Sequence, residues 1–141
     1  MYRDNPDAVR ATPEQMQRKH MFVVNGSPDF LSLVRELLQG EQFNVTTTNF
    51  VPLSFKSIEA AEPALLIIDL VIGEAAGWDL LAELRAAATT RDFPVLLISS
   101  SPELLDRAIQ QHEAFGGDRY LDKPLDIEDL LAVVADMVGP A

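Results

Sequence analysis

The chain has 141 residues, a formal net charge of −11, 48% hydrophobic residues and no cysteine. This length and composition are typical of one compact globular domain, and the missing cysteines exclude disulfides, thiolate zinc sites and cysteine nucleophiles. The negative charge disfavours nucleic acid as a partner, and no apolar run reaches the roughly 20 residues of a membrane span, so we expect a soluble protein of the cytoplasm.

Residues 1–20 mix charges of both signs with two prolines and contain no sustained apolar period. This pattern predicts a flexible N-terminal extension. A short helix over residues 13–19 is compatible with a cap at Thr12 and with Pro13 at the first helical position. We therefore place the folded domain at residues 21–139.

From residue 21 the sequence changes to short apolar runs separated by amphipathic stretches, which is typical of alternating strands and helices in a parallel sheet. The apolar runs predict five strands, over residues 21–24, 43–48, 64–68, 94–98 and 119–121. The amphipathic stretches predict five helices, over residues 28–40, about 52–61, 78–88, 102 to about 115, and 127–138.

The residues that start and end these helices support their bounds. Ser27 with Pro28, and Ser101 with Pro102, are typical of helix starts, and Asp126 is expected to cap the last helix. Five strand and helix units in alternation favour a doubly wound α/β sheet, because parallel strands are joined by right-handed crossovers.

Ligands of doubly wound sheets bind beyond the carboxyl ends of the strands. The polar residues at those ends are Asn25 after the first strand, Asp69 after the third, Ser99 after the fourth and Lys123 after the fifth. We expect these side chains to converge and to form the candidate site.

Four segments of the chain resemble the receiver domain of response regulators, over about residues 21–139. They are FVVNGSPDFLSLVRELL, LLIIDLVIGEAAGWDLL, PVLLISSSPE and DRYLDKPLDIEDLL. The resemblance implies a flavodoxin-like (βα)5 fold with strand order 2-1-3-4-5 and helices on both faces. It also implies a signalling module of a two-component phosphorelay rather than an enzyme.

The resemblance assigns roles to individual residues. Asp69 matches the aspartate that accepts a phosphoryl group, and Lys123 matches the lysine that contacts that group. The bond from Lys123 to Pro124 matches a cis peptide, for which X-Pro is the common setting. Ser99 matches the hydroxyl residue that binds a phosphoryl oxygen, and Tyr120 matches the aromatic switch residue.

The sequence departs from the family where two adjacent acidic residues normally bind Mg²⁺, because it has Asn25 and Gly26 there. An amide is a weaker magnesium ligand than a carboxylate, and glycine has no side chain, so the expected cofactor Mg²⁺ is predicted to bind weakly or not at all. Val71, at a further ligand position, contributes only its backbone carbonyl. Asp29 and Glu74 are the nearest replacement carboxylates in the sequence.

Three functional hypotheses follow. In the first, the chain is a pseudo-receiver in which Lys123 pairs with Asp69 and protein contacts carry the signal, since phosphoryl transfer without Mg²⁺ leaves negative charge uncompensated. In the second, it is a conventional receiver phosphorylated at Asp69. The third, a flavodoxin-like ligand-binding protein or enzyme, lacks support because no glycine-rich phosphate loop follows the first strand.

The resemblance also implies partners. They are a histidine kinase or phosphotransfer protein and a downstream target, with no nucleic acid or membrane, and a homodimer is compatible with the face formed by the fourth helix, fifth strand and fifth helix. Because the sequence stops after the fifth helix, we expect a stand-alone receiver whose output passes through another protein.

Other residues admit simpler interpretations. Tyr120 is compatible with edge packing as well as with a switch, and Trp78 is predicted to be a packing residue or partner contact. His20 and His112 have no companion at metal-ligand spacing, so both are expected to be solvated surface histidines.

Overall fold

A computed structural model describes residues 18–49, 54–71, 75–111 and 117–139. Its elements alternate between strands and helices along these segments. They are β1 (His20–Val24), α2 (Pro28–Gly40), β2 (Asn44–Thr48), α3 (Ser54–Ala61), β3 (Leu65–Asp69), α4 (Ala76–Ala86), β4 (Val95–Ser99), α5 (Pro102–Gln110), β5 (Arg119–Asp122) and α7 (Ile127–Val138).

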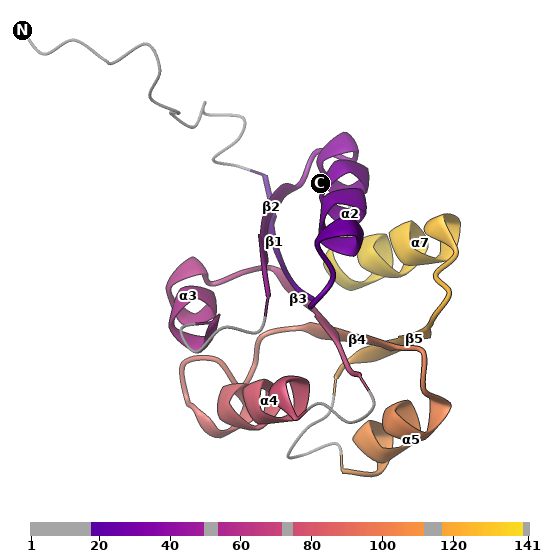
Figure 1. Cartoon of the computed structure of the whole chain (residues 1–141). Coiled ribbons are helices and arrows are strands. Elements are labelled where there is room, and N and C mark those ends of the chain that lie inside the picture. The colour runs from indigo at the N-terminus through magenta and orange to yellow at the C-terminus, as the bar shows by residue number, and fades with distance from the viewer. Residues whose placement is uncertain (1–17, 50–53, 72–74, 112–116, 140–141) are drawn as a thin grey trace, which may run out of the picture.

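The strands form one five-stranded sheet in the order β2-β1-β3-β4-β5. All four neighbouring pairs are parallel. Helices α2 and α7 cover one face, whereas α3, α4 and α5 cover the other (Figure 1). This arrangement confirms the predicted doubly wound α/β fold and its strand order.

Alternating residues of the central strands fill two separate cores, as expected for strands that are covered on both faces. The core under α3, α4 and α5 contains Phe22 and Val24 of β1 together with Leu66 and Ile68 of β3. The core under α2 and α7 contains the intervening residues of the same strands and of β4: Met21, Val23, Leu65, Ile67, Leu96 and Ile98. These two cores hold the central strands rigidly in register.

Three helices begin at the caps that the sequence predicts. The side chains of Ser27, Ser101 and Asp126 accept hydrogen bonds from backbone N–H groups in the first turns of α2, α5 and α7. Helix α4 begins at Ala76, two residues earlier than predicted, because its N-cap residue Ala75 makes no side-chain cap and so leaves no signal in the sequence.

The remaining bounds differ from the predicted ones by a few residues. Strand β1 begins at His20, inside the segment predicted to be an extension, because the β2 strand lies alongside it and His20 pairs with Asn44. Helix α5 ends at Gln110, and its predicted continuation to residue 115 falls largely outside the described residues. The helix predicted over residues 13–19 also lies mostly outside them.

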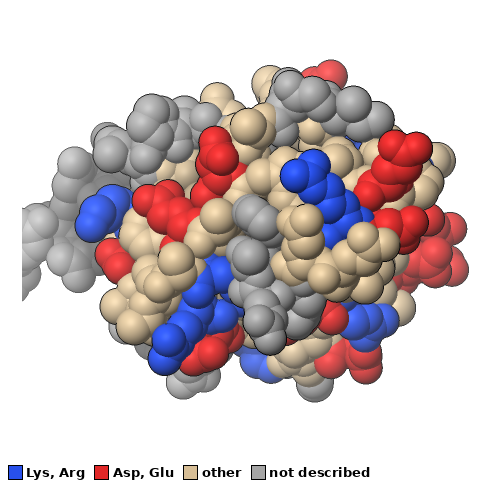
Figure 2. Space-filling view, turned by 90° about the horizontal axis from the view of Figure 1, so that it is seen from below, with Lys and Arg blue, Asp and Glu red and all other residues tan. Residues whose placement is uncertain are grey.

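Within the described residues, the helices are too short and too polar for any of them to cross a membrane. The face seen from below in Figure 1 carries acidic and basic side chains interspersed with uncharged ones (Figure 2). On this face, the described residues do not form the continuous basic stripe that a nucleic-acid backbone would require.

Candidate functional site

The carboxyl ends of the strands are tied together by backbone hydrogen bonds. The N–H of Asn25 donates to the carbonyl of Thr48 over 3.1 Å, and the N–H of Lys123 donates to the carbonyl of Ser99 over 2.9 Å. The sheet ladder thus continues one residue beyond β1 and β5, and this fixes where the polar side chains of the site emerge.

Asp69 is the last residue of β3 and is buried, with 4% of its surface exposed. The Nζ atom of Lys123 lies 3.0 Å from its Oδ2 atom. The peptide bond between Lys123 and Pro124 is cis, as the family resemblance implies. Aspartate and lysine therefore meet at the carboxyl edge of the sheet, although they are far apart in the sequence.

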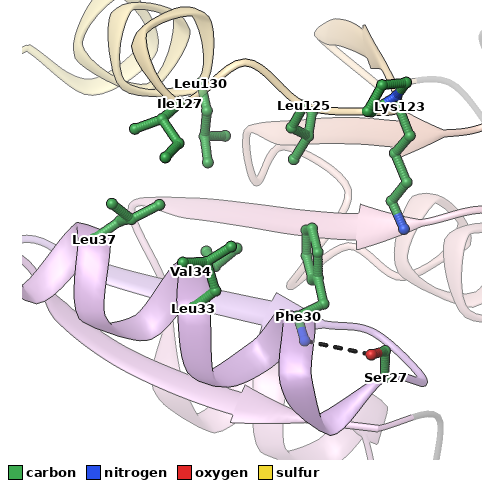
Figure 3. A pocket seen from close by; sticks show the side chains of 10 residues that line it. Ser27, Phe30, Leu33, Val34, Leu37, Lys123, Leu125, Ile127 and Leu130 are labelled. Atoms are coloured by element: carbon green, nitrogen blue, oxygen red, sulfur yellow. Dashed lines mark hydrogen bonds between the residues drawn. The ribbon is translucent and has the colours of Figure 1, made fainter.

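Lys123 also contacts an aromatic ring. Its Nζ atom lies 4.6 Å from the centre of the Phe30 ring on α2, within the range of a cation–π interaction. Both residues line a groove of about 330 Å³ between α2 and α7. Figure 3 shows the lysine side chain extending from the segment after β5 toward α2, with Leu33 and Ile127 farther along the groove.

Asn25 follows β1 and is 1% exposed. Its Oδ1 atom accepts a hydrogen bond from the backbone N–H of Ser27 at 2.7 Å. Its Nδ2 atom is buried and has no hydrogen-bond partner among the described residues. Because Val24 and Ile68 are register partners, Asn25 and Asp69 occupy adjacent positions one residue farther along neighbouring strands.

Ser99 is buried at the end of β4, beside Asp69. Its hydroxyl donates to the carbonyl of Leu70 over 2.6 Å and accepts from the N–H of Ser101 at 3.0 Å. The hydroxyl thus joins the segments that follow β3 and β4. It would have to leave the Leu70 carbonyl in order to donate to a ligand.

Tyr120 lies on β5 and packs against the core under α3, α4 and α5. Its hydroxyl accepts a hydrogen bond from the N–H of Gly117 at 3.2 Å. Burial is the main cause that raises the pKa of Tyr120 above its usual value of 10.0. The ring is therefore an inward-facing packing element in this structure.

The structure describes one of the two candidate replacement carboxylates. Asp29 is exposed on the first turn of α2, and Glu74 lies outside the described residues. Gly26 and Val71 are exposed and sit at the site's margin. Among the residues that the structure describes, His, Asp and Glu side chains form no group of three able to hold a metal ion.

The prediction for His20 is wrong. His20 is half-buried, and its Nε2 atom lies 2.8 Å from the hydroxyl of Thr46 on β2. Burial lowers its pKa below 6.5.

The partly buried Trp78 packs against the core, as predicted for a packing residue. The Arg107 guanidinium lies 5.1 Å from the centre of the Trp78 ring. His112 lies outside the described residues.

Sequence reasoning missed two residues of the site. One is Phe30, because nothing in the apolar pattern of a helix distinguishes a ring that packs on a lysine from a ring of the core. Ser27 was recognised as a helix cap, but the contact of its N–H with Asn25 depends on loop geometry.

Comparison with known proteins identifies the family. The response regulator receiver domain model matches residues 21–135. CpxR, a transcriptional regulatory protein of Klebsiella pneumoniae, is 30% identical over 112 residues, which are 79% of this chain and 46% of that protein. RpaA, a DNA-binding dual master transcriptional regulator of Synechocystis, is 36% identical over 73 residues, 52% of this chain and 30% of that protein.

The chain thus spans less than half the length of these curated relatives. Among solved structures, the receiver domain of the sensor histidine kinase PA1611 from Pseudomonas aeruginosa has a TM-score of 0.73 at 19% identity, covering 86% of this chain and 98% of that one. That structure holds a magnesium ion in its active site cleft. Fold, strand order and the match over residues 21–135 together show that the chain belongs to the response regulator receiver domain family, a signalling module of two-component systems.

Proposed function

We propose that this receiver acts in a phosphorelay with Asp69 in the phosphoacceptor position, that its Mg²⁺-dependent phosphorylation is weak or absent, and that it signals through protein contacts. The ion pair between Lys123 and Asp69 at 3.0 Å carries this proposal. The pair supplies the carboxylate with a positive partner inside the protein, so that the folded state does not need an external cation.

The residues present do not fit a magnesium ion. Mg²⁺ requires near-ideal octahedral oxygen geometry and is recruited by carboxylates. The oxygen of Asn25 already accepts from the N–H of Ser27, and the nitrogen of the same amide is a donor. Gly26 offers no side chain. Asp69 would be the single carboxylate ligand among the described residues around this site, and Lys123 already holds one of its oxygens.

We assign switch roles to two further residues. Ser99 would couple the state of Asp69 to the loop after β4, because its hydroxyl already bridges the carbonyl of Leu70 and the N–H of Ser101. Tyr120 would report movement of that loop, because β5 pairs with the β4 strand that leads into the loop and the Tyr120 ring packs against the core. Both roles rest on the family resemblance together with these contacts.

The proposed partners are a histidine kinase or phosphotransfer protein and a downstream target protein in the cytoplasm. The face formed by α5, β5 and α7 supports such a contact, or a homodimer, because Ile109 on α5 is 51% exposed. Arg119 on β5 pairs with Asp136 on α7 and stiffens the same face.

A conventional receiver is the second candidate. It is favoured by Lys123, Ser99 and the cis bond to Pro124, all of which are present with Asp69 in one site. The two candidates differ in a measurable property, because a conventional receiver binds Mg²⁺ before its aspartate reacts.

Calorimetric titration with Mg²⁺ tests the proposal. We expect no resolvable binding to the natural chain at millimolar concentration. The matched variant combines Asn25→Asp with Gly26→Asp, which restores both carboxylates. Apart from its chain neighbours, no atom of the described residues lies within 4 Å of a Cβ atom built at Gly26, so the first carbon of the added side chain meets no clash there. This variant should bind Mg²⁺, and tight binding by the natural chain would refute the proposal in favour of the conventional receiver.

A further inference from the structure

The amide of Asn25 is held in one orientation. Its Oδ1 atom accepts from the backbone N–H of Ser27 at 2.7 Å, and only the oxygen of an amide can accept. The NH₂ group must therefore point the other way. It is buried and has no hydrogen-bond partner among the described residues, which is an unfavourable state for a donor.

The strand register places Asn25 beside Asp69. Val24 and Ile68 are partners in the ladder between β1 and β3, so the residues after them stand side by side. Alternation along both strands places Asn25 and Asp69 on the same face, toward α2 and α7, where Lys123 also lies. An unsatisfied buried donor at this position indicates a ligand that supplies an oxygen acceptor.

The same position in the family holds a carboxylate that needs a cation to offset its charge. Here neither Asn25 nor Gly26 carries charge, so a phosphoryl group entering the site meets less repulsion even when no cation is present. Two donors, the Nδ2 atom of Asn25 and the Nζ atom of Lys123, are available to it.

We propose that Asn25 replaces the cation, so that Asp69 accepts a phosphoryl group from an acyl phosphate without any divalent metal. A carboxylate oxygen of Asp69 attacks phosphorus, the bond from phosphorus to the donor's carboxylate oxygen breaks, and the leaving carboxylate takes the electron pair, so no proton is required. The Asn25 amide and the Lys123 ammonium each donate to a phosphoryl oxygen. This inference rests on the proposed role of Asp69 as phosphoacceptor.

The test is incubation of the full chain with acetyl phosphate, in EDTA and in MgCl₂, followed by intact-mass measurement over time. We expect a single phosphoryl adduct to form at the same rate in both buffers and to be absent from Asp69→Ala.

The decisive variant is Asn25→Asp. Its carboxylate keeps the shape of the side chain and can still accept from the N–H of Ser27, but it replaces the donor with a negative charge. We expect its adduct to form about tenfold more slowly in EDTA, as the loss of one charge-assisted hydrogen bond predicts. In MgCl₂ the rate should recover. Circular dichroism and thermal unfolding establish that each variant is folded.

Three results would overturn the inference: no adduct in EDTA, an adduct that persists in Asp69→Ala, or an unchanged EDTA rate in Asn25→Asp. Comparison of adduct formation in the two buffers also separates this inference from the proposed function. No adduct in either buffer removes the inference alone, because signalling through contacts needs none. A stoichiometric adduct that requires MgCl₂ contradicts both.

Discussion

At the scale of single residues, Lys123 holds the site together through two different contacts. Its ammonium pairs with the buried carboxylate of Asp69 at 3.0 Å and lies over the ring of Phe30 at 4.6 Å. A quarter of its side chain is exposed, compared with 5% for Asp69. The lysine therefore loses less hydration than the aspartate, and the aspartate depends on the lysine more than the reverse.

Removal of this ammonium should destabilise the fold. We expect Lys123→Met to lower the free energy of unfolding by about 2–3 kcal/mol, because it leaves a buried carboxylate without its cation. Adding Asp69→Asn to it should recover most of the loss, since the uncompensated charge is then gone. Urea unfolding of both single variants and the double variant measures the coupling. Additive effects would mean that the pair contributes no net stability.

The same residues show how far sequence reasoning reaches. Asp69 and Lys123 were predicted to meet because each follows a strand, and parallel strands bring their carboxyl ends to one edge. The orientation of the Asn25 amide was not predictable, because a 2.7 Å contact with the N–H of Ser27 decides it. The position of Phe30 over Lys123 was missed for a similar reason, since it depends on how α2 is rotated.

At the scale of elements, the approach of α4 to β3 depends on a glycine. A Cβ atom at Gly77, on the first turn of α4, would lie 2.9 Å from Leu70 Cδ2 and 3.2 Å from the carbonyl oxygen of Asp69. Both distances are shorter than normal contacts. The first turn of the helix thus packs directly on the backbone of Asp69 and on the side chain of Leu70.

We expect Gly77→Ala to destabilise the protein by about 1–3 kcal/mol, as overpacking of a core does. The matched control is Gly40→Ala at the last residue of α2, where a Cβ atom would have no other atom within 4 Å. That variant should be neutral or slightly stabilising, because alanine restricts the unfolded chain. Thermal unfolding of the two variants compares them directly, and equal losses would contradict the close-packing argument.

Element bounds were predictable where a side chain marks them. Ser27, Ser101 and Asp126 each accept from a first-turn N–H, so the starts of α2, α5 and α7 were correct. The start of α4 was wrong because Ala75 offers no cap. After α2, the residue with a left-handed backbone is Gln42, whose φ is 72°, and not Gly40. No residue pattern in the sequence indicates this position.

At the scale of the whole molecule, the alternation of strands and helices predicted a doubly wound sheet, because crossover handedness leaves few arrangements for five units, and the family resemblance supplied the strand order. Charge distribution was less predictable. The guanidinium of Arg85 lies 3.5 Å from the carboxylate of Asp118, although the two residues are 33 positions apart in the sequence. Arg119 on β5 pairs with Asp136 on α7. Which charged residues pair depends on the tertiary fold, whereas the net charge follows from the sequence alone.

That net charge leads to a prediction about salt. With 22 acidic and 11 basic residues, repulsion among like charges opposes the compact state. Raising NaCl from 10 mM to 500 mM shortens the screening length from about 30 Å to a few ångströms and weakens this repulsion. We expect a gain of about 1 kcal/mol, or about 3 °C in Tm, measured by calorimetry.

The buried pair should contribute little to this salt effect, because screening acts mainly on exposed charges. Lys123→Met is therefore expected to show the same slope of Tm against salt as the natural chain, at a lower Tm throughout. A Tm that falls with salt would mean that attraction within surface pairs such as Arg119 with Asp136 outweighs the general repulsion. A steeper rise of Tm with salt in Lys123→Met would instead place the ion pair within reach of the solvent ions, because the natural chain would then lose the attraction of that pair as salt is added.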